Sequence, residues 1–219
     1  MAVVVGTWPF SLEAVKLISR KLREGNGCID ALEIIEEDPD TGLYFVGRGG
    51  LPNSKGILEC DAAVMDGDTC RFGAVAALQG VATAFSVARC VMEKSPHSML
   101  VGSGAQEFAQ NNGFPVESNS ALQTQQSREA FQKFLEKSGE EEGGHDTIGI
   151  LVMDSRSHLV ADWSSSRFVL RWSGHTFCLI LNMGHSPQES CELVIKEAQQ
   201  KARTATKPFE MALIAINKK

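Results

Sequence analysis

Apolar and polar positions change their period along this chain of 219 residues, which predicts a mixture of helices and strands. A β-branched run at residues 2–5 predicts an opening strand. From Leu12 to Leu22 the apolar positions recur at helical spacing, and Ser11 in front of them predicts a capped helix. Residues 28–37 repeat that spacing, so a second helix is expected there.

The middle of the chain alternates turn-rich and apolar segments. Residues 43–66 hold short apolar runs separated by glycine-, proline- and asparagine-rich sequence, which is typical of a β-hairpin region. Residues 74–92 are small and apolar and predict one long helix, which a strand at 98–102 and a helix near 105–110 follow. A polar stretch comes next, with an exposed helix expected at 127–138 and an acidic glycine loop behind it.

Apolar strands dominate the remainder. They are expected at 145–154, 158–163 and 167–172, with turns at 155–157 and 164–166. A strand at 177–182, a helix at 187–205 and a strand at 209–216 complete the pattern. Helices and short strands in alternation predict one domain over residues 1–219 with an α/β (α+β) architecture.

Composition and charge narrow the classes of function. A hydrophobic fraction of 43% suffices for a substantial core, and a net charge of -6 argues against nucleic acid or an anionic membrane as partner. No apolar run is long enough to cross a bilayer. The amino-terminal residues lack the basic segment and apolar core of a secretory signal, so a cytoplasmic location is expected.

Neither a metal nor a cofactor is expected from the motifs. The six cysteines include no C-x-x-C pair and no Cys/His cluster in sequence, which argues against a structural zinc site and favours reduced thiols. Gly47, Gly49 and Gly50 lack the strand and helix context of a dinucleotide fingerprint.

Thr147 is the strongest catalytic candidate, since it joins an acidic loop to an apolar strand. A threonine hydroxyl needs a base beside it to become a nucleophile. Cleavage of the bond before Thr147 would create an α-amino group on the same residue, with an ordinary pKa near 8, and that amine could act as the base. From the pattern alone, the alternative is a β-branched residue that merely opens a strand.

A series of motifs identifies the family. GTWPF near the amino terminus, GGLPNSKGILECDAAVMDGDT, FGAVAAL, HSMLVGSGAQEFAQNNGF and GGHDTIG occur in that order. Together they resemble the aspartylglucosaminidases (glycosylasparaginases), which are N-terminal-nucleophile hydrolases. The resemblance implies a four-layer αββα sandwich that cleaves itself into an α chain, residues 1–146, and a shortened β chain, residues 147–219. An α/β heterodimer, and a homodimer of these, are the implied assemblies.

The same resemblance implies an enzymatic function with named residues. Thr147 would attack the side-chain amide of an asparagine derivative and form a β-aspartyl ester. The substrate would be N4-(β-N-acetylglucosaminyl)-L-asparagine, L-asparagine or a β-aspartyl peptide. Ser165 matches a hydroxyl beside the nucleophile, although it also fits a plain turn. The remaining implied residues are His145 and Asp146 for self-cleavage, and Trp8, Gly174 and His175 for substrate binding.

The carboxyl-terminal third departs from the family pattern. His175 follows Gly174 where the family has an arginine that binds the substrate carboxylate, and a histidine is a weaker carboxylate ligand. Between Cys178 and Pro187 the family's TGxGD-type oxyanion segment has no equivalent, which fits an internal deletion and an early stop. The alternative function is therefore a catalytically impaired family member that acts by binding. A lysosomal location is the alternative if a signal peptide is missing from this form.

Overall fold

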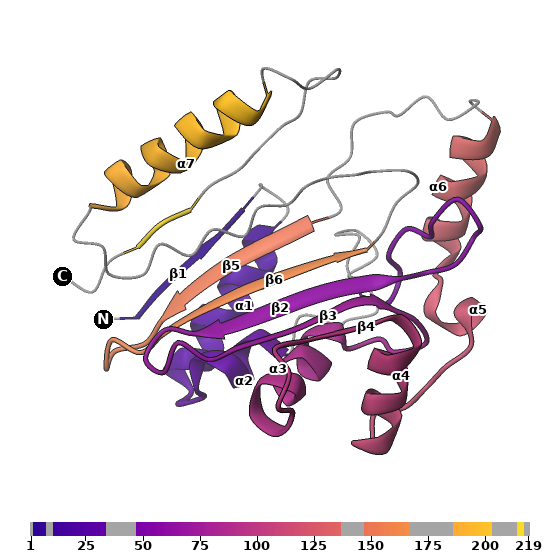
Figure 1. The fold of residues 1–219 in the computed structure, drawn as a ribbon, viewed down its shortest axis with the longest axis horizontal. Coiled ribbons are helices and arrows are strands. Elements are labelled where there is room, and N and C mark those ends of the chain that lie inside the picture. Colours follow the sequence, from indigo (N-terminus) through magenta and orange to yellow (C-terminus); the bar gives the residue numbers. More distant parts are fainter. Residues whose placement is uncertain are drawn as a thin grey trace.

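The structure is a computed structural model that describes residues 2–7, 11–33, 47–136, 147–166, 186–202 and 214–216. Within these ranges helices and strands alternate along the chain, as expected (Figure 1). The strands are β1 (Val3–Gly6), β2 (Cys60–Asp66), β3 (Phe72–Leu78), β4 (Met99–Val101), β5 (Thr147–Met153) and β6 (Leu159–Ser166). The helices are α1 (Leu12–Arg23), α2 (Cys28–Glu33), α3 (Ala84–Lys94), α4 (Gly102–Asn111), α5 (Asn119–Leu122), α6 (Gln125–Glu136) and α7 (Pro187–Ala202).

The six strands form one sheet in the order β1-β5-β6-β2-β3-β4. All neighbours are antiparallel except β3 and β4, which are parallel. The hairpin β5–β6 therefore lies inside the sheet, between the amino-terminal strand β1 on one side and the β2–β3 hairpin on the other (Figure 1). Segments far apart in sequence meet there, because β5 pairs with β1 on one side and β6 pairs with β2 on the other.

One face of the sheet carries the core. Val64 on β2 and Ile150 on β5 flank β6 at the same level, and both are fully buried. They belong to one apolar cluster with Ile18 of α1, Leu32 of α2 and Phe85 of α3. Helices α1, α2 and α3 lie on this side of the sheet in Figure 1. Burial of these side chains supplies the main driving force that holds the helices on the sheet.

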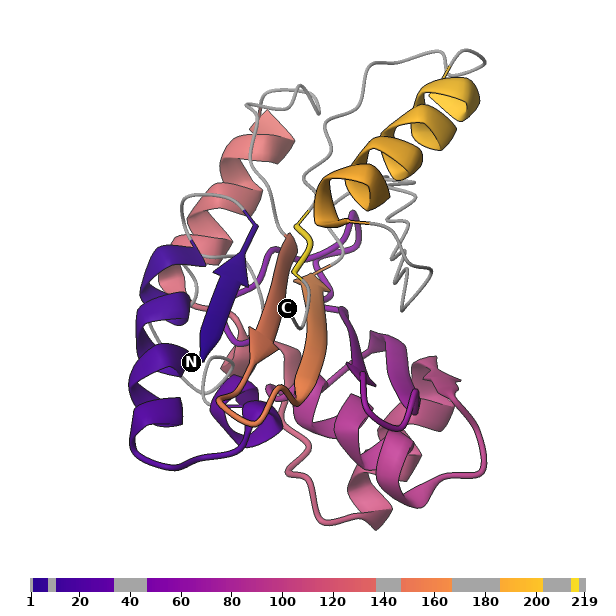
Figure 2. The same ribbon diagram turned by 90° about the vertical axis from the view of Figure 1, so that its left-hand side faces the viewer.

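The other face of the sheet points away from α1–α3. Residues that alternate with the core positions belong to it, among them Leu151 on β5, Ala161 on β6 and Met65 on β2, which share one register row. Helix α7 lies on this side of the molecule (Figures 1 and 2). The predicted strands at 167–172 and 177–182 lie outside the described residues, as does most of 209–216. The mixed α/β architecture is thus confirmed, and the four-layer sandwich stays a prediction.

The long helix predicted at 74–92 is wrong. Residues 72–78 form β3, which pairs with β2, and the helix begins only at Ala84. The small side chains that suggested a helix instead let α3 lie very close to the sheet. A Cβ added at Gly73 would come within 2.6 Å of the Met92 backbone nitrogen. Gly80, with a φ of +74°, separates the two elements, since other residues rarely adopt this conformation.

Two smaller predictions are also corrected. The turn expected at 164–166 is the end of β6, because Ser164 pairs with Ile148 on one side and with Ala62 on the other. Ser11 does precede α1, but its side chain makes no capping hydrogen bond. The turn at 155–157 is confirmed. None of the helices in the described ranges combines the length and apolar character needed to cross a membrane.

Candidate active site at the start of strand β5

Thr147 is the first residue of β5 and lies directly opposite Ser165 of β6. The register brings together two residues that the sequence analysis assigned to catalysis. Residues opposed in this way share one face of a sheet, at Cβ separations of about 4.5–5.5 Å. The pair belongs to the face away from α1–α3, at the end of the β5–β6 hairpin that is remote from its turn.

Asp61 extends this row onto the next strand. It lies opposite Ser165 in the pairing of β2 with β6. Its Oδ1 accepts a hydrogen bond of 2.7 Å from the backbone N–H of Ala77, whose φ of 50° marks an irregularity in β3. The sequence analysis did not single out Asp61, although a carboxylate within an otherwise apolar strand was a usable signal.

Thr7 anchors β5 from the other side. Its N–H donates to the Gly149 carbonyl at 2.8 Å, and its Oγ1 accepts from the Gly149 N–H at 2.9 Å. The side-chain hydroxyl thus takes the place of a backbone acceptor at the point where the chain leaves β1 toward Trp8. A Cβ at Gly149 would lie 3.5 Å from both Thr7 Oγ1 and Cγ2. These two hydrogen bonds therefore hold the amino-terminal segment against β5 at Gly149, two residues after Thr147.

Replacing Thr7 with valine should lower the free energy of unfolding by about 1–2 kcal/mol, because the Gly149 N–H loses its acceptor while the side-chain volume hardly changes. The melting temperature should fall by about 2–8 °C for a domain of this size. Thr69→Val is the matched control, since Thr69 is exposed and accepts only a 3.4 Å contact from Arg71. Equal melting temperatures for the two variants would contradict this role of Thr7.

The other site residues predicted from the sequence lie outside the described part of the chain. Trp8 directly follows Thr7 in sequence, and His145 and Asp146 directly precede Thr147. Gly174 and His175 also fall in an undescribed range. Their assignments remain predictions. Of the predicted set, the structure brings together Thr147 and Ser165.

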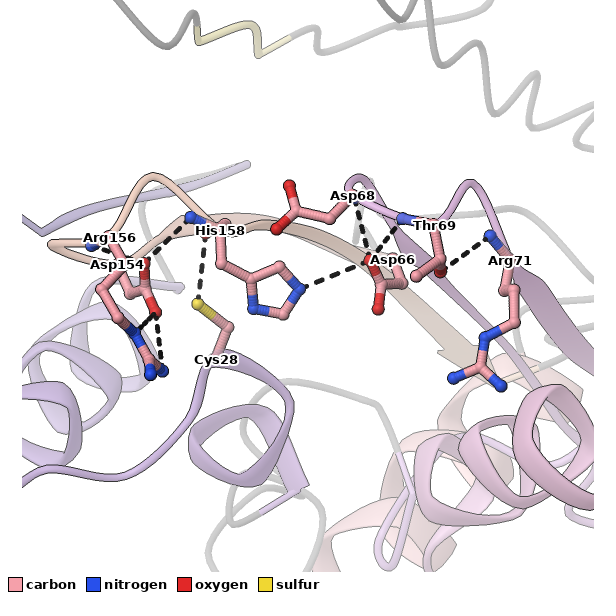
Figure 3. A network of polar contacts seen from close by, with 8 residues as sticks. All are labelled: Cys28, Asp66, Asp68, Thr69, Arg71, Asp154, Arg156 and His158. Carbon is pink, nitrogen blue, oxygen red and sulfur yellow. Dashed lines mark hydrogen bonds and ion pairs between the residues drawn. The ribbon is translucent and has the colours of Figure 1, made fainter.

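A second polar cluster lies at the opposite end of the β5–β6 hairpin, where Cys28, Asp154, His158 and Asp66 converge (Figure 3). Burial and the negative charge of Asp154 raise the pKa of the Cys28 thiol to about 11. Burial also acts to raise the pKa of Asp66, but N–H groups of the β2–β3 turn and the His158 side chain outweigh it and lower the pKa overall. Cys28 is thus protonated at neutral pH and unsuited to act as a free nucleophile.

Comparison with known proteins decides the family. The profile of the asparaginase family matches residues 11–175, which is most of the chain. The chain belongs to the asparaginase family. The family resemblance predicted from the motifs is thereby confirmed, and the matching relatives carry the names of asparaginases and of a glycosylasparaginase.

Three relatives of this asparaginase-family chain show the names that the matching proteins carry. The N(4)-(β-N-acetylglucosaminyl)-L-asparaginase of Elizabethkingia miricola is 29% identical over 265 aligned positions, covering 99% of this chain and 76% of the relative. The isoaspartyl peptidase/L-asparaginase of Homo sapiens is 33% identical, covering 70% of this chain and 51% of the relative. The plant-type L-asparaginase of Pyrococcus furiosus is 39% identical, covering 58% and 42%.

Coverage differs among these asparaginases. The chain spans three quarters of the Elizabethkingia protein but only about half the length of the isoaspartyl peptidase relatives. The alignment with the Elizabethkingia protein runs over 265 positions, whereas this chain has 219 residues. The bacterial relative therefore contains inserted residues that have no counterpart here.

Proposed function

We propose that this chain is an amidohydrolase that cuts itself before Thr147 and then uses Thr147 as its nucleophile. The observation that carries the proposal is the position of Thr147, which is the first residue of an inner strand, β5, and lies opposite Ser165. Membership of the asparaginase family supports the reaction class. A strand start suits this role because the pairing of β5 with β6 fixes the backbone of the residue that would act as the nucleophile.

Self-cleavage would proceed in two steps. The Thr147 hydroxyl attacks the carbonyl carbon of Asp146, the peptide C–N bond breaks, and the chain is joined at that point by an ester. The nitrogen freed by this cleavage takes up the hydroxyl proton and becomes the α-amine of Thr147. Water then opens the ester, which leaves a carboxyl group on Asp146 and restores the Thr147 hydroxyl. His145 and Asp146 serve this step. The products are an α chain of residues 1–146 and a β chain of residues 147–219, associated as a heterodimer that can pair into a homodimer of heterodimers.

Turnover would reuse the same hydroxyl. The new α-amino group, with an ordinary pKa near 8, accepts the hydroxyl proton as the oxygen attacks the substrate amide. The amine leaves with a proton, and water hydrolyses the resulting β-aspartyl ester. Ser165 offers a second hydroxyl donor beside Thr147, while Trp8, Gly174 and His175 contribute to the substrate pocket.

The substrate class follows from what the relatives' names have in common. One name refers to the N-acetylglucosamine-linked side chain of asparagine, and the other to asparagine and isoaspartyl peptides. In each case the bond cut is an amide at the β-carboxyl group of an aspartyl residue. We therefore propose a small asparagine-type substrate and no nucleic acid or membrane partner. A cytoplasmic location, with the lysosome as alternative, stays a prediction.

The four-layer sandwich is part of this proposal. The face that carries Thr147 points away from α1–α3, and we propose that a second sheet covers it, to which the strands expected at 167–172 and 177–182 would belong. A pocket between two sheets would then surround Thr147. A binding protein without activity is the alternative, and neither the family nor the relatives' names favour it.

A turnover assay tests the function. The purified protein should release the amine component from an aspartylglucosamine analogue, L-asparagine or a β-aspartyl dipeptide, and the relative rates define the substrate. Thr69→Ala, with an exposed threonine at the far end of the sheet, should match the wild type. If protein cut before Thr147 releases nothing from any of the three, the alternative of a binding protein replaces the proposal.

A further inference from the structure

The polar cluster at the turn of the β5–β6 hairpin brings together three different metal-binding side chains. Cys28 is the first residue of α2, and Asp154 and His158 lie at the two ends of the turn (Figure 3). One ligand atom from each lies within 4.8 Å of the other two. We propose that Cys28, Asp154 and His158 form a binding site for a zinc-type divalent transition-metal ion.

The distances suit a tetrahedral ion after small side-chain adjustments. Zinc lies about 2.0–2.3 Å from sulfur, nitrogen and oxygen ligands, so the ligand atoms around it are about 3.5 Å apart. Shifts of about 1 Å per side chain would bring these three atoms from their present spacing to that geometry. Solvent would supply the fourth ligand, because the His158 side chain is 26% exposed while Cys28 and Asp154 are buried.

His158 is oriented as a metal-binding histidine is in known sites. Its Nε2 lies 3.4 Å from Asp66 Oδ1, and Figure 3 shows its other ring nitrogen turned toward the Cys28 sulfur. Asp66 Oδ1 also accepts from the backbone N–H groups of Asp68 at 2.9 Å and Thr69 at 3.1 Å, which fixes it. A carboxylate behind the histidine is the usual outer partner of a metal ligand, where it sets the ring orientation.

Asp154 has one oxygen available for a metal. Its Oδ1 accepts short backbone hydrogen bonds from Arg156, at 2.8 Å, and His158, at 2.9 Å, and so organises the turn. Its Oδ2 has only 3.4 Å contacts with the Arg156 side chain, which is largely exposed. The carboxylate can therefore keep the turn in place with one oxygen and bind an ion with the other.

The ligand set indicates the class of metal. Thiolate and imidazole together favour zinc, cobalt, nickel or copper over magnesium and calcium, which prefer oxygen ligands. On binding, the Cys28 thiol releases its proton to solvent and the sulfur coordinates the ion. The ion would fasten α2 to the hairpin turn. This site is distinct from the catalytic one, since β5 separates it from Thr147 by about 20 Å.

The experiment uses cobalt as a visible probe. Chelator-treated protein is titrated with Co²⁺ and then with Zn²⁺, on the Thr147→Ala background so that one uncut chain is present. We expect one equivalent of Co²⁺ with a sulfur-to-cobalt charge-transfer band, which Zn²⁺ displaces. Cys28→Ser should remove the band and His158→Gln should weaken binding at least tenfold. Asp66→Asn should weaken it about 10- to 100-fold while keeping the band at saturation.

Two cysteine variants serve as controls. Cys90→Ser changes a buried thiol of α3 outside the cluster, and Cys70→Ser changes an exposed thiol. Both should keep the band and the affinity. The proposal is overturned if the unmutated cluster gives no band, if Cys28→Ser retains it, or if Cys70→Ser removes it. Circular dichroism in the presence of chelator checks that each variant is folded. If Cys28→Ser unfolds, the proposal is tested by His158→Gln instead, and unchanged Co²⁺ affinity of that variant overturns it.

Discussion

Turnover should fall roughly a million-fold when Thr147 is replaced with alanine, which is the size of loss seen when a hydrolase loses its nucleophile. Alanine removes the hydroxyl to which we assign both the self-cleavage and the attack on substrate. The variant should therefore also remain a single chain of 23.7 kDa. Enzyme assays of the variant and of the wild type at saturating substrate measure the ratio of their turnover numbers.

Thr147→Ser removes only the methyl group of the side chain and so tests the contribution of the hydroxyl by itself. Serine keeps the nucleophilic oxygen and, after cleavage, the α-amino base, so this variant should still be cut and should retain measurable turnover. Thr69→Ala should behave as wild type in both respects. Activity of Thr147→Ala within tenfold of the wild type would show that another group is the nucleophile.

Phe85→Ala should cost about 3–5 kcal/mol of folding stability, which is the ordinary cost of removing a fully buried phenylalanine from a core. Phe85 lies in the first turn of α3 and is only 1% exposed, in the cluster that joins α3 to the sheet. Alanine would leave a cavity at this contact. Denaturant or thermal unfolding measures the change, and a melting temperature lower by about 6–20 °C corresponds to it.

A surface leucine provides the comparison for Phe85. Leu12 opens α1 and is 54% exposed, so Leu12→Ala should change stability by no more than about 0.5 kcal/mol. The difference between the two variants isolates the contribution of burial. If Phe85→Ala cost as little as Leu12→Ala, the packing of α3 on β2 and β3 would be wrong.

Helices and strands were predicted best from the sequence where the run of periodic apolar residues begins and ends close to the ends of the observed element. Helix α1, strand β5 and the start of β6 follow their apolar patterns directly. The prediction of one helix over residues 74–92 was wrong because alanine favours a helix in isolation, whereas pairing with β2 makes the first part of this segment a strand. Ser164–Ser166 resembles a turn by composition, but pairing on both sides keeps it in β6. Such pairing is tertiary information that local propensity does not contain.

The two polar sites differ in how far the sequence could predict them. Thr147 and Ser165 were predicted from motifs as parts of one site, and the register of β5 and β6 places them opposite each other. Cys28 and His158 are 130 residues apart and match no ligand spacing, so the expectation of no metal rested on local sequence alone. Only the fold brings α2 to the turn of the β5–β6 hairpin. Asp61 likewise could be linked to the candidate active site only after the strand pairing showed that it lies opposite Ser165.

The central claim is that Thr147 becomes an amino-terminal nucleophile, and the intact mass of the purified wild-type protein tests it most directly. Under denaturing conditions we predict two fragments, residues 1–146 and 147–219, whose masses sum to that of the chain plus one water. Amino-terminal sequencing of the smaller fragment should then begin Thr147-Ile148-Gly149. A single chain of 23.7 kDa that persists on prolonged incubation, or a cut at any other bond, would contradict the account.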